Sequence, residues 1–423
     1  MKRKLFALIC GGPLLAALLL PTFAKASAFA KATADKSADT SAFAKASAFA
    51  KATADKSADG ARVVVAAAGE ATAPTATAPT ATAPVAAQTI LLRLEAPFKP
   101  QLSYGDQLLS EDTVWRGEVL VEGAVTVAPQ ATLTVEPGTV VRFKKSEGHN
   151  PTLVVQGRIA ASGTKEEPIR FTSNFVTSAA GDWLGITLLG SEKKNVLENC
   201  RIDGAQTGLE ALFSNLNLNG VRAERCVTGM RFQDALVQME AGGASDCDAG
   251  LVFANSEATL RSLNLIGNRA GISAQKSSIY LQDASLAMNR SALSCDNCRV
   301  KLAGGAVLDN GRGVTLLESE GGVSGVKLAR NSDYGLSLTG SRVRVEGNLI
   351  TGNGTQGVLV FDGAAVAWNN TISGNSGYDI YNAGTEEFRA PNNFWGENGP
   401  RIYDNGGRGK VGFAPQLKTA PKQ

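Results

Sequence analysis

The chain has 423 residues, 43% of them hydrophobic and 19% charged, which is enough apolar material for a folded core. The formal net charge of +3 depends on four cations within residues 1–26, and the remainder is close to neutral. A near-neutral chain lacks the electrostatic footprint of a protein that binds nucleic acid or an anionic membrane. One histidine and four methionines exclude a multi-histidine metal site and a methionine-rich copper site, so we expect no cofactor.

Residues 1–26 have the features of a secretory signal peptide. A basic start at 2–4 precedes an apolar stretch at 5–20, and Ala-Lys-Ala at 24–26 supplies a small-x-small cleavage site. The apolar stretch is short for a membrane span and is interrupted by Gly11, Gly12 and Pro13. We therefore expect export to the periplasm, the outer surface or the medium, with no membrane span after processing.

Residues 27–88 are of low complexity. The segment at 23–39 recurs unchanged at 43–59, and Pro74, Pro79 and Pro84 then recur every five residues. Such a segment has no apolar stripe with which to dock and stays extended and solvated. We interpret it as a disordered tether; a duplicated genetic insertion without function is the alternative.

Small residues recur downstream with a period of 21 or 22. They are Gly208, Gly229, Gly250, Gly271, Ala292, Gly313, Gly335 and Gly357. Within each period apolar residues come in pairs two apart, as in the coil of Leu336, Leu338, Val343, Val345 and Ile350, where Asn348 occupies the remaining position. Spacing by two indicates short strands with one face inward. We predict an all-β right-handed parallel β-helix solenoid of roughly 21–22-residue coils, with three strands per coil. It should span 117–390, between an N-terminal cap at 89–116 and a C-terminal cap and tail at 391–423.

A second column, 18 positions after the glycines, carries asparagine in six consecutive coils. The residues are Asn268, Asn289, Asn310, Asn331, Asn353 and Asn375. Asparagine tolerates a left-handed turn, and its amide can bond the same amide one coil away. We expect a buried asparagine ladder. Cys226 and Cys247 hold the same column just before it, where stacked thiols are expected because parallel Cβ vectors make a disulfide awkward.

Several segments resemble a known superfamily. They are TLTVEPGTVVRF (132–143), LVVQGRIAASGTKEEPIRFTS (153–173), NTISGN (370–375) and NNFWG (392–396). They resemble the secreted right-handed parallel β-helix repeat proteins of the pectin-lyase-like superfamily. The resemblance implies this fold over about 115–415. Its functions are diverse: lyases, hydrolases, epimerases, tailspikes, copper-site maturation factors and non-catalytic surface proteins.

The outward columns of the predicted strands carry few catalytic groups. Glu210 is the one carboxylate among the three columns that we examined, and its neighbour Arg231 makes a surface ion pair the expected role for it. Hydrolysis of a glycoside needs two carboxylates. The middle column includes Tyr280, Lys301, Gly322 and Arg344 in succession. Tyr280 is the one aromatic residue in these columns, which argues against sugar stacking along the strand faces.

The remaining candidates lie in loops. Asp234, Asp283 and Asp296 are scattered and read as solvated turn residues, and His149 lies in a polar loop. Cys295 and Cys298 form a single CxxC pair, which lacks the second ligand pair that zinc would need. In an exported protein the pair could form a local disulfide.

These observations predict an exported, non-catalytic β-helix protein of the cell envelope or surface, with a structural or glycan-binding role. Its partner would be a cell-surface glycan or an envelope protein, and the sequence does not indicate an oligomeric state. The first alternative is a polysaccharide lyase, hydrolase or epimerase with catalytic residues on loops. The second is a periplasmic metal-site maturation factor.

Overall fold

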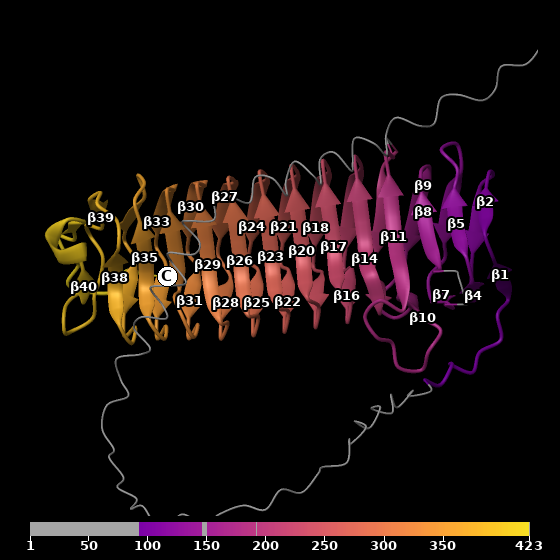
Figure 1. Ribbon diagram of the computed structural model, residues 1–423, viewed down its shortest axis with the longest axis horizontal. Helices are drawn as coiled ribbons and strands as arrows, with labels where there is room; N and C mark the ends of the chain where they lie inside the picture. The colour runs from indigo at the N-terminus through magenta and orange to yellow at the C-terminus, as the bar shows by residue number, and fades with distance from the viewer. Residues whose placement is uncertain (1–92, 146–149, 192, 423) are drawn as a thin grey trace, which may run out of the picture. The chain divides into compact units, whose positions relative to one another are not determined.

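The computed structural model describes residues 93–145, 150–191 and 193–422, and it shows a coil of short β-strands (Figure 1). Each turn of the coil adds one strand to each of three parallel sheets, which have 13, 14 and 14 strands. The predicted all-β class and the three strands per coil are confirmed. The signal peptide (1–26), the tether (27–88) and His149 lie outside the described residues. Within the described residues, no helix is long and apolar enough to cross a membrane.

The first sheet contains mostly strands of three or four residues, whose middle side chains point inward. Its strands are β1 (Leu102–Tyr104), β4 (Glu118–Val121), β7 (Val140–Phe143), β10 (Ile169–Ser173), β13 (Cys200–Asp203), β16 (Arg222–Glu224), β19 (Gly243–Ser245), β22 (Asn264–Ile266), β25 (Ser285–Ala287), β28 (Ala306–Leu308), β31 (Lys327–Ala329), β34 (Leu349–Thr351) and β37 (Thr371–Ser373). The short strands make this the narrowest side of the coil.

The second sheet contains the longest strands. They are β2 (Gln107–Leu109), β5 (Ala124–Val127), β8 (Thr152–Val155), β11 (Trp183–Leu189), β14 (Ala205–Leu212), β17 (Thr228–Gln233), β20 (Ala249–Ala254), β23 (Ala270–Gln275), β26 (Ser291–Asp296), β29 (Arg312–Leu317), β32 (Leu336–Thr339), β35 (Gln356–Phe361), β38 (Tyr378–Asn382) and β40 (Ile402–Tyr403). In the middle of the solenoid its central outward column carries small side chains, Ser273, Ser294, Thr315 and Ser337.

The third sheet follows the second in every coil. Its strands are β3 (Thr113–Trp115), β6 (Thr132–Val135), β9 (Arg158–Ser162), β12 (Asn195–Glu198), β15 (Asn215–Asn219), β18 (Leu236–Glu240), β21 (Glu257–Arg261), β24 (Ser278–Gln282), β27 (Arg299–Ala303), β30 (Glu320–Ser324), β33 (Arg342–Glu346), β36 (Val366–Trp368), β39 (Phe388–Arg389) and β41 (Val411–Gly412). A single 3-10 turn, η1 (Asn405–Gly407), lies between β40 and β41.

The core is a continuous apolar column enclosed by the three sheets. Alternate residues of each strand point inward, so that Leu251, Ile272 and Leu293 stack one above another at 0–1% exposure. Phe232 and Phe253 stack in the same way with ring centroids 5.0 Å apart. Each such side chain contributes about 1.5–3 kcal/mol of burial energy, and it does so only when the neighbouring coil is present.

The repeating glycines are explained by the close approach of successive coils. A Cβ atom on Gly229 would lie 2.6 Å from the carbonyl oxygen of Gly250, and one on Gly250 would lie 2.6 Å from that of Gly271. At such distances a side chain forces the backbone of the next coil to move. Glycine recurs at these positions because the backbones of successive coils stack too closely for a side chain.

Polar columns occupy the corners between sheets. Between the first and second sheets the six predicted asparagines are 0–2% exposed. Asn289 Nδ2 donates to Asn310 Oδ1 at 3.0 Å, and the backbone N–H of Asn289 donates to the same atom at 2.9 Å. Each buried amide from Asn268 to Asn353 is thus satisfied by its neighbour one coil further on, and Asn375 Nδ2 donates to Asp379 Oδ1 at 3.0 Å. Cys226 N–H donates to Cys247 Sγ at 3.4 Å in the same column.

Two further columns differ from the expectation. Asn348, which the apolar periodicity assigns to an inward hydrophobic position, begins a second asparagine ladder at the corner between the third and first sheets. Its Nδ2 donates to Asn370 Oδ1, and Asn370 Nδ2 donates to Asn393 Oδ1, both at 2.9 Å. The corner between the second and third sheets holds serines and Cys298, with Cys298 N–H donating to Ser319 Oγ at 3.1 Å. Every corner is therefore stabilised by side chains that accept backbone N–H groups.

The solenoid is longer than the predicted range of 117–390. Strand β1 already pairs with β4, with Leu102 opposite Val119, and β39 pairs with β41 at the other end, with Phe388 opposite Val411. Both expected caps therefore contain coil strands. The terminal coils depart from the 21-residue step, so their strands cannot be found by counting from the glycine column.

Candidate functional site

The structure places Glu210 and Arg231 on neighbouring strands of the second sheet. They lie directly opposite each other in β14 and β17, with Arg231 Nη1 3.8 Å from Glu210 Oε1. The two side chains are 24% and 46% exposed. An ion pair of this kind in solvent contributes little to stability.

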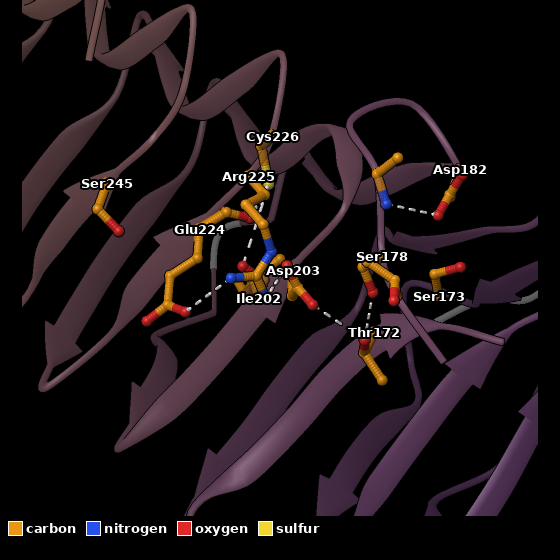
Figure 2. A network of polar contacts seen from close by, with 12 residues as sticks. Thr172, Ser173, Ser178, Asp182, Ile202, Asp203, Glu224, Arg225, Cys226 and Ser245 are labelled. Atoms are coloured by element: carbon orange, nitrogen blue, oxygen red, sulfur yellow. Dashed lines mark hydrogen bonds and ion pairs between the residues drawn. The ribbon is translucent and has the colours of Figure 1, made fainter. Parts of the chain in front are cut away.

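A polar network lies at the corner between the first and second sheets (Figure 2). Asp203, which ends β13, accepts a hydrogen bond from Thr172 Oγ1 at 3.3 Å, and its other oxygen lies 2.9 Å from Arg225 Nη2. Thr172 Oγ1 is also 3.0 Å from Ser178 Oγ, and Arg225 Nη1 lies 3.9 Å from Glu224 Oε2. The hydrogen bond to Asp203 raises the pKa of Arg225. The carboxylates of this corner are thus held by cations and hydroxyls.

The loop at 174–182, which contains Ser178, is also held by Arg93. Arg93 bonds both oxygens of Asp182, one through Nη2 at 2.8 Å, and its guanidinium lies 4.2 Å from the centre of the Phe175 ring. Asp182 also accepts the N–H of Ala179 at 2.8 Å. Since Asp182 and Asp203 are both engaged, we interpret this region as a structural brace for the loop at 174–182.

A different arrangement occupies the outward face of the third sheet. From β24 to β39 this face carries five cations and two carboxylates. They are Arg299, Lys301, Arg342, Arg344 and Arg389, with Glu320 and Glu346. Among the described residues, Arg299 is the one of these cations that pairs with a carboxylate, Glu320, at 3.0 Å. The face as a whole is positively charged.

The middle column of this face leaves a gap between two cations. Gly322 lies between Lys301 and Arg344 in register. A Cβ atom on Gly322 would meet a single neighbour within 4 Å, the carbonyl oxygen of Arg344 at 3.5 Å. Two strand spacings separate the cations by roughly 9–10 Å at the backbone. The gap is open, and both charged side chains border it.

Tyr280 precedes Lys301 in the same column. Lys301 Nζ lies 4.9 Å from the centre of the Tyr280 ring, and the Tyr280 hydroxyl is 3.1 Å from Gln282 Oε1. These two residues, with Ser278 and Arg299, line a hollow of about 280 Å³. A phenol ring and an ammonium group therefore lie against each other at the edge of a shallow depression on an outward face.

The hollow is continuous with a longer groove along the corner between the second and third sheets. The groove measures about 800 Å³ and runs from Asn255 to Glu386 over successive coils, sharing Ser278 and Arg299 with the hollow. Its floor is the corner column of Ser277, Cys298 and Ser319. Its walls carry charges of both signs: Glu257, Lys276, Arg299, Glu318, Glu320, Arg342 and Glu386. A groove of this shape and polarity suits an extended hydrophilic chain.

The five cysteines that the structure describes are free thiols, and all are buried. Cys295 points into the core between Ala274 and Leu316, whereas Cys298 belongs to the serine column and accepts the N–H of Ser277 at 3.4 Å. The hydrogen bond from Cys295 lowers the pKa of Cys298 to about 7 and raises that of Cys295. Cys295 and Cys298 are free thiols in contact with each other, and a disulfide between them stays a prediction.

The cationic column is present in the sequence but carries no carboxylate, the group on which the expected chemistry depended. Lys301, Gly322 and Arg344 stand in register in the sequence itself, directly after Tyr280. What the sequence could not indicate is the depression that Tyr280 and Lys301 border, because it depends on neighbouring side chains such as Ser278 and Arg299. Among the described residues, no three histidine, cysteine, aspartate or glutamate side chains converge as metal ligands.

Comparison with known proteins supports the fold. Residues 108–224 match a family described as a pectate-lyase-like β-helix domain, and residues 249–394 match the family of right-handed β-helix regions. The chain is a right-handed parallel β-helix repeat protein. No curated protein sequence matches this β-helix chain at a significant level.

Similar solved structures include three polysaccharide-modifying enzymes. A double mutant of the periplasmic alginate epimerase AlgG shares 11% identity over 70% of this chain and 85% of that one, with a TM-score of 0.42. An alginate lyase from Paenibacillus sp. str. FPU-7 shares 13% identity over 67% and 93%, with a TM-score of 0.28. The A-module of the Azotobacter vinelandii mannuronan C-5 epimerase AlgE4 shares 15% over 74% and 88%, with a TM-score of 0.34.

The prediction of a non-catalytic protein is contradicted by this comparison, since the solved proteins to which the β-helix is similar are enzymes. The physical reason for the error is that it was based on the scarcity of carboxylates, which matters for glycoside hydrolysis. Chemistry at a carbon next to a carboxylate can use tyrosine, lysine and arginine instead. At these identities the likeness shows the fold alone, and the activity has to be argued from the residues of this chain.

Proposed function

We propose that the protein binds and modifies an acidic polysaccharide on the outward face of the third sheet. The observation that carries the proposal is the column of Tyr280, Lys301 and Arg344 around the open position of Gly322. Two cations beside a gap suit a sugar carboxylate, because an anion of that size can be bound between them. The surplus of cations on strands β24 to β39 favours a polyanion over a neutral chain.

The chemistry that these groups support is proton abstraction at C5 of a uronate. Lys301 and Arg344 would hold the carboxylate and stabilise the charge that develops on it when the C5 proton leaves. Tyr280, acting as the phenolate, would accept the C5 proton on its oxygen, since its ring borders the hollow and lies against Lys301. The electron pair of the C5–H bond moves into the carboxylate. A proton from water on the opposite face of the ring then gives the epimer, whereas transfer of the Tyr280 proton to the departing C4 oxygen breaks the C4–O bond and gives an unsaturated product.

The groove supports a polymeric substrate. It extends along the solenoid beyond the hollow, and its walls carry three cations and four carboxylates over successive coils. A chain of several sugar residues could therefore contact successive coils while one residue occupies the hollow. Such a polymer is found outside the cytoplasm, which agrees with the export proposed from the signal-peptide features of residues 1–26.

The test is a turnover assay on the full-length protein with alginate and polygalacturonate. Unsaturated uronates are followed by ultraviolet absorbance, and epimerisation by proton NMR of the anomeric region. Tyr280→Phe should lower turnover by about a hundredfold or more. Lys301→Gln and Arg344→Gln should each lower kcat/KM by about a hundredfold.

Lys327→Gln is the matched control, because Lys327 is an exposed cation on β31 of the first sheet. It should leave both turnover and the melting temperature unchanged. Absence of turnover and binding with every acidic polymer would overturn the proposal. Turnover that persists in all three site variants would place the chemistry elsewhere on the β-helix.

A further inference from the structure

We propose a second carbohydrate-binding site, a tyrosine platform at the C-terminal end of the second sheet. The platform consists of Tyr378, Tyr381 and Tyr403, three of the six tyrosines of the chain. They lie on β38 and β40, with Tyr381 directly opposite Tyr403 and with Tyr378 at the start of β38. The proposal relies on the proposed function for the kind of polymer, but its site is on a different sheet.

The three rings form one cluster. Tyr381 and Tyr403 stack with centroids 4.2 Å apart and an interplanar angle of 10°. Tyr378 stands at a steep angle to both, at 5.4 Å from Tyr381 and 5.7 Å from Tyr403. Burial and the neighbouring Tyr403 raise the pKa of Tyr381, which keeps its hydroxyl protonated as a hydrogen-bond donor.

The cluster is on the outside of the solenoid. In the same outward column, the preceding coils carry small hydroxyl side chains, ending with Thr315 and Ser337, before Leu359 leads to Tyr381. Tyr378 is 37% exposed and Phe361, on the neighbouring strand β35, is 51% exposed. This corrects the expectation that Tyr280 is the one outward aromatic residue, because the columns continue for two coils beyond those that the glycine period reaches.

The chemistry of the cluster fits a pyranose ring. A sugar ring has an apolar face of C–H groups and a rim of hydroxyls, and aromatic rings with polar tips match both. Polar groups border the rings: Gln356 lies opposite Tyr378 in register, and the exposed Arg401 is two residues before Tyr403. Arg401 gives the platform a cation that a uronate carboxylate can approach.

The platform also lies close to the proposed substrate groove along the chain. Phe361 ends β35, and Gly363, two residues later, lines the groove together with Glu386. The groove thus reaches the corner where β35 ends, and Tyr381 lies on the neighbouring strand in register with Leu359, two residues before Phe361. A polymer that leaves the C-terminal end of the groove reaches the rings, so the platform would hold the chain while the hollow at Tyr280 acts on it.

The experiment measures binding of hexamers of mannuronate and of galacturonate to the full-length protein by calorimetry at low and high salt. Tyr378→Ala and Tyr403→Ala should each weaken binding by about three- to tenfold, the range expected from loss of one aromatic contact. The loss should persist at high salt, because stacking is not screened, whereas the loss in Lys301→Gln should shrink. Phe213→Ala, which removes a 61% exposed aromatic ring far along the chain from the platform, should bind normally.

Nitration by tetranitromethane, mapped by mass spectrometry, separates this proposal from the proposed function. Protection of Tyr378 and Tyr403 by the hexamers supports the platform, whatever happens at Tyr280. Protection of Tyr280 alone would overturn the platform and leave the proposed function in place. Protection of neither site would overturn both proposals. Light scattering adds a further outcome: a dimer that dissociates in Tyr403→Ala, with unchanged glycan binding, would assign the rings to self-association and overturn the platform.

Discussion

The ammonium group of Lys301 lies 4.9 Å from the centre of the Tyr280 ring, one coil away on the outward face of the third sheet. The contact places a cation and a phenol in register without burying either of them in the core. Parallel stacking of coils makes this possible, because residues one period apart come to lie side by side. A site on this scaffold can therefore be built from one residue in each of several coils.

Gly322 tests whether the gap in this column is used. Gly322→Leu should raise the Kd for an acidic hexamer by at least about tenfold, the effect of a clash of about 1.4 kcal/mol. Stability should change little, because the nearest atom to the added Cβ is 3.5 Å away. Calorimetry and thermal unfolding measure the two effects. Unchanged binding in this variant would mean that no ligand enters the gap.

The neighbouring glycine should behave in the opposite way. Gly321 has a φ of +131°, and a Cβ there would lie 1.9 Å from the carbonyl oxygen of Val300. Gly321→Ala should therefore lower stability by about 1–3 kcal/mol, as expected for a side chain in a backbone region that is nearly restricted to glycine. Urea titration followed by circular dichroism measures the loss. Equal midpoints for the Gly321 and Gly322 variants would contradict the assignment of roles.

The asparagine ladder makes a second prediction about stability. Asn310→Leu should cost about 1–3 kcal/mol, because it removes an acceptor that serves both the N–H and the Nδ2 of Asn289. Asn297→Gly is the control. Asn297 lies at a turn with a φ of 53°, which glycine adopts readily. The free energy of unfolding of this variant should therefore stay within about 0.5 kcal/mol of that of the unchanged protein. A smaller loss in the Asn310 variant than in the control would argue against a cooperative ladder.

Most of the fold could be predicted from the sequence, because period and alternation determine which side chains point inward. The glycine column, the strand pairs and the ladder from Asn268 to Asn375 all follow from counting. Asn348 shows where counting fails: its position is apolar in earlier coils, such as Val326, and the change to a polar column occurs within the repeat. Asn348 Oδ1 accepts the backbone N–H of Val326, a bond that a valine side chain cannot make and that the period does not indicate.

The candidate site was less predictable, for a different reason. Lys301 and Arg344 were in register in the sequence, but a cation on a strand usually signals a solvated face. Their significance depends on the hollow beside Tyr280, and a hollow depends on the side chains of adjoining corners. Tyr403 was missed because the last coils depart from the period. The alternation of apolar and polar residues predicts which side chains point inward, but it does not predict the shape of the outer surface.

The brace in Figure 2 predicts a local effect of mutation. Asp203→Asn leaves Arg225 with only its longer contact to Glu224, so amide exchange across the loop at 174–182 should accelerate. We expect a global loss of about 1–3 kcal/mol from this charged hydrogen bond. Asp309→Asn is the matched control: Arg330 pairs with Asp309 on an exposed part of the surface, and its loss should have no measurable effect. Slow exchange in the Asp203 variant would show that the loop is held without it.

Cys298 provides the last test, since it replaces serine in an otherwise regular column. The thiol accepts the N–H of Ser277, and the N–H of Cys298 donates to Ser319. Cys298→Ser keeps an acceptor at the same place and should change stability by less than about 0.5 kcal/mol. Cys298→Ala leaves the buried N–H of Ser277 without an acceptor and should cost about 1–3 kcal/mol. Urea titrations under reducing conditions compare the two. If both variants lose the same stability, packing of the sulfur stabilises this corner and the hydrogen bond does not. The serine column beneath the groove would then follow from turn geometry alone.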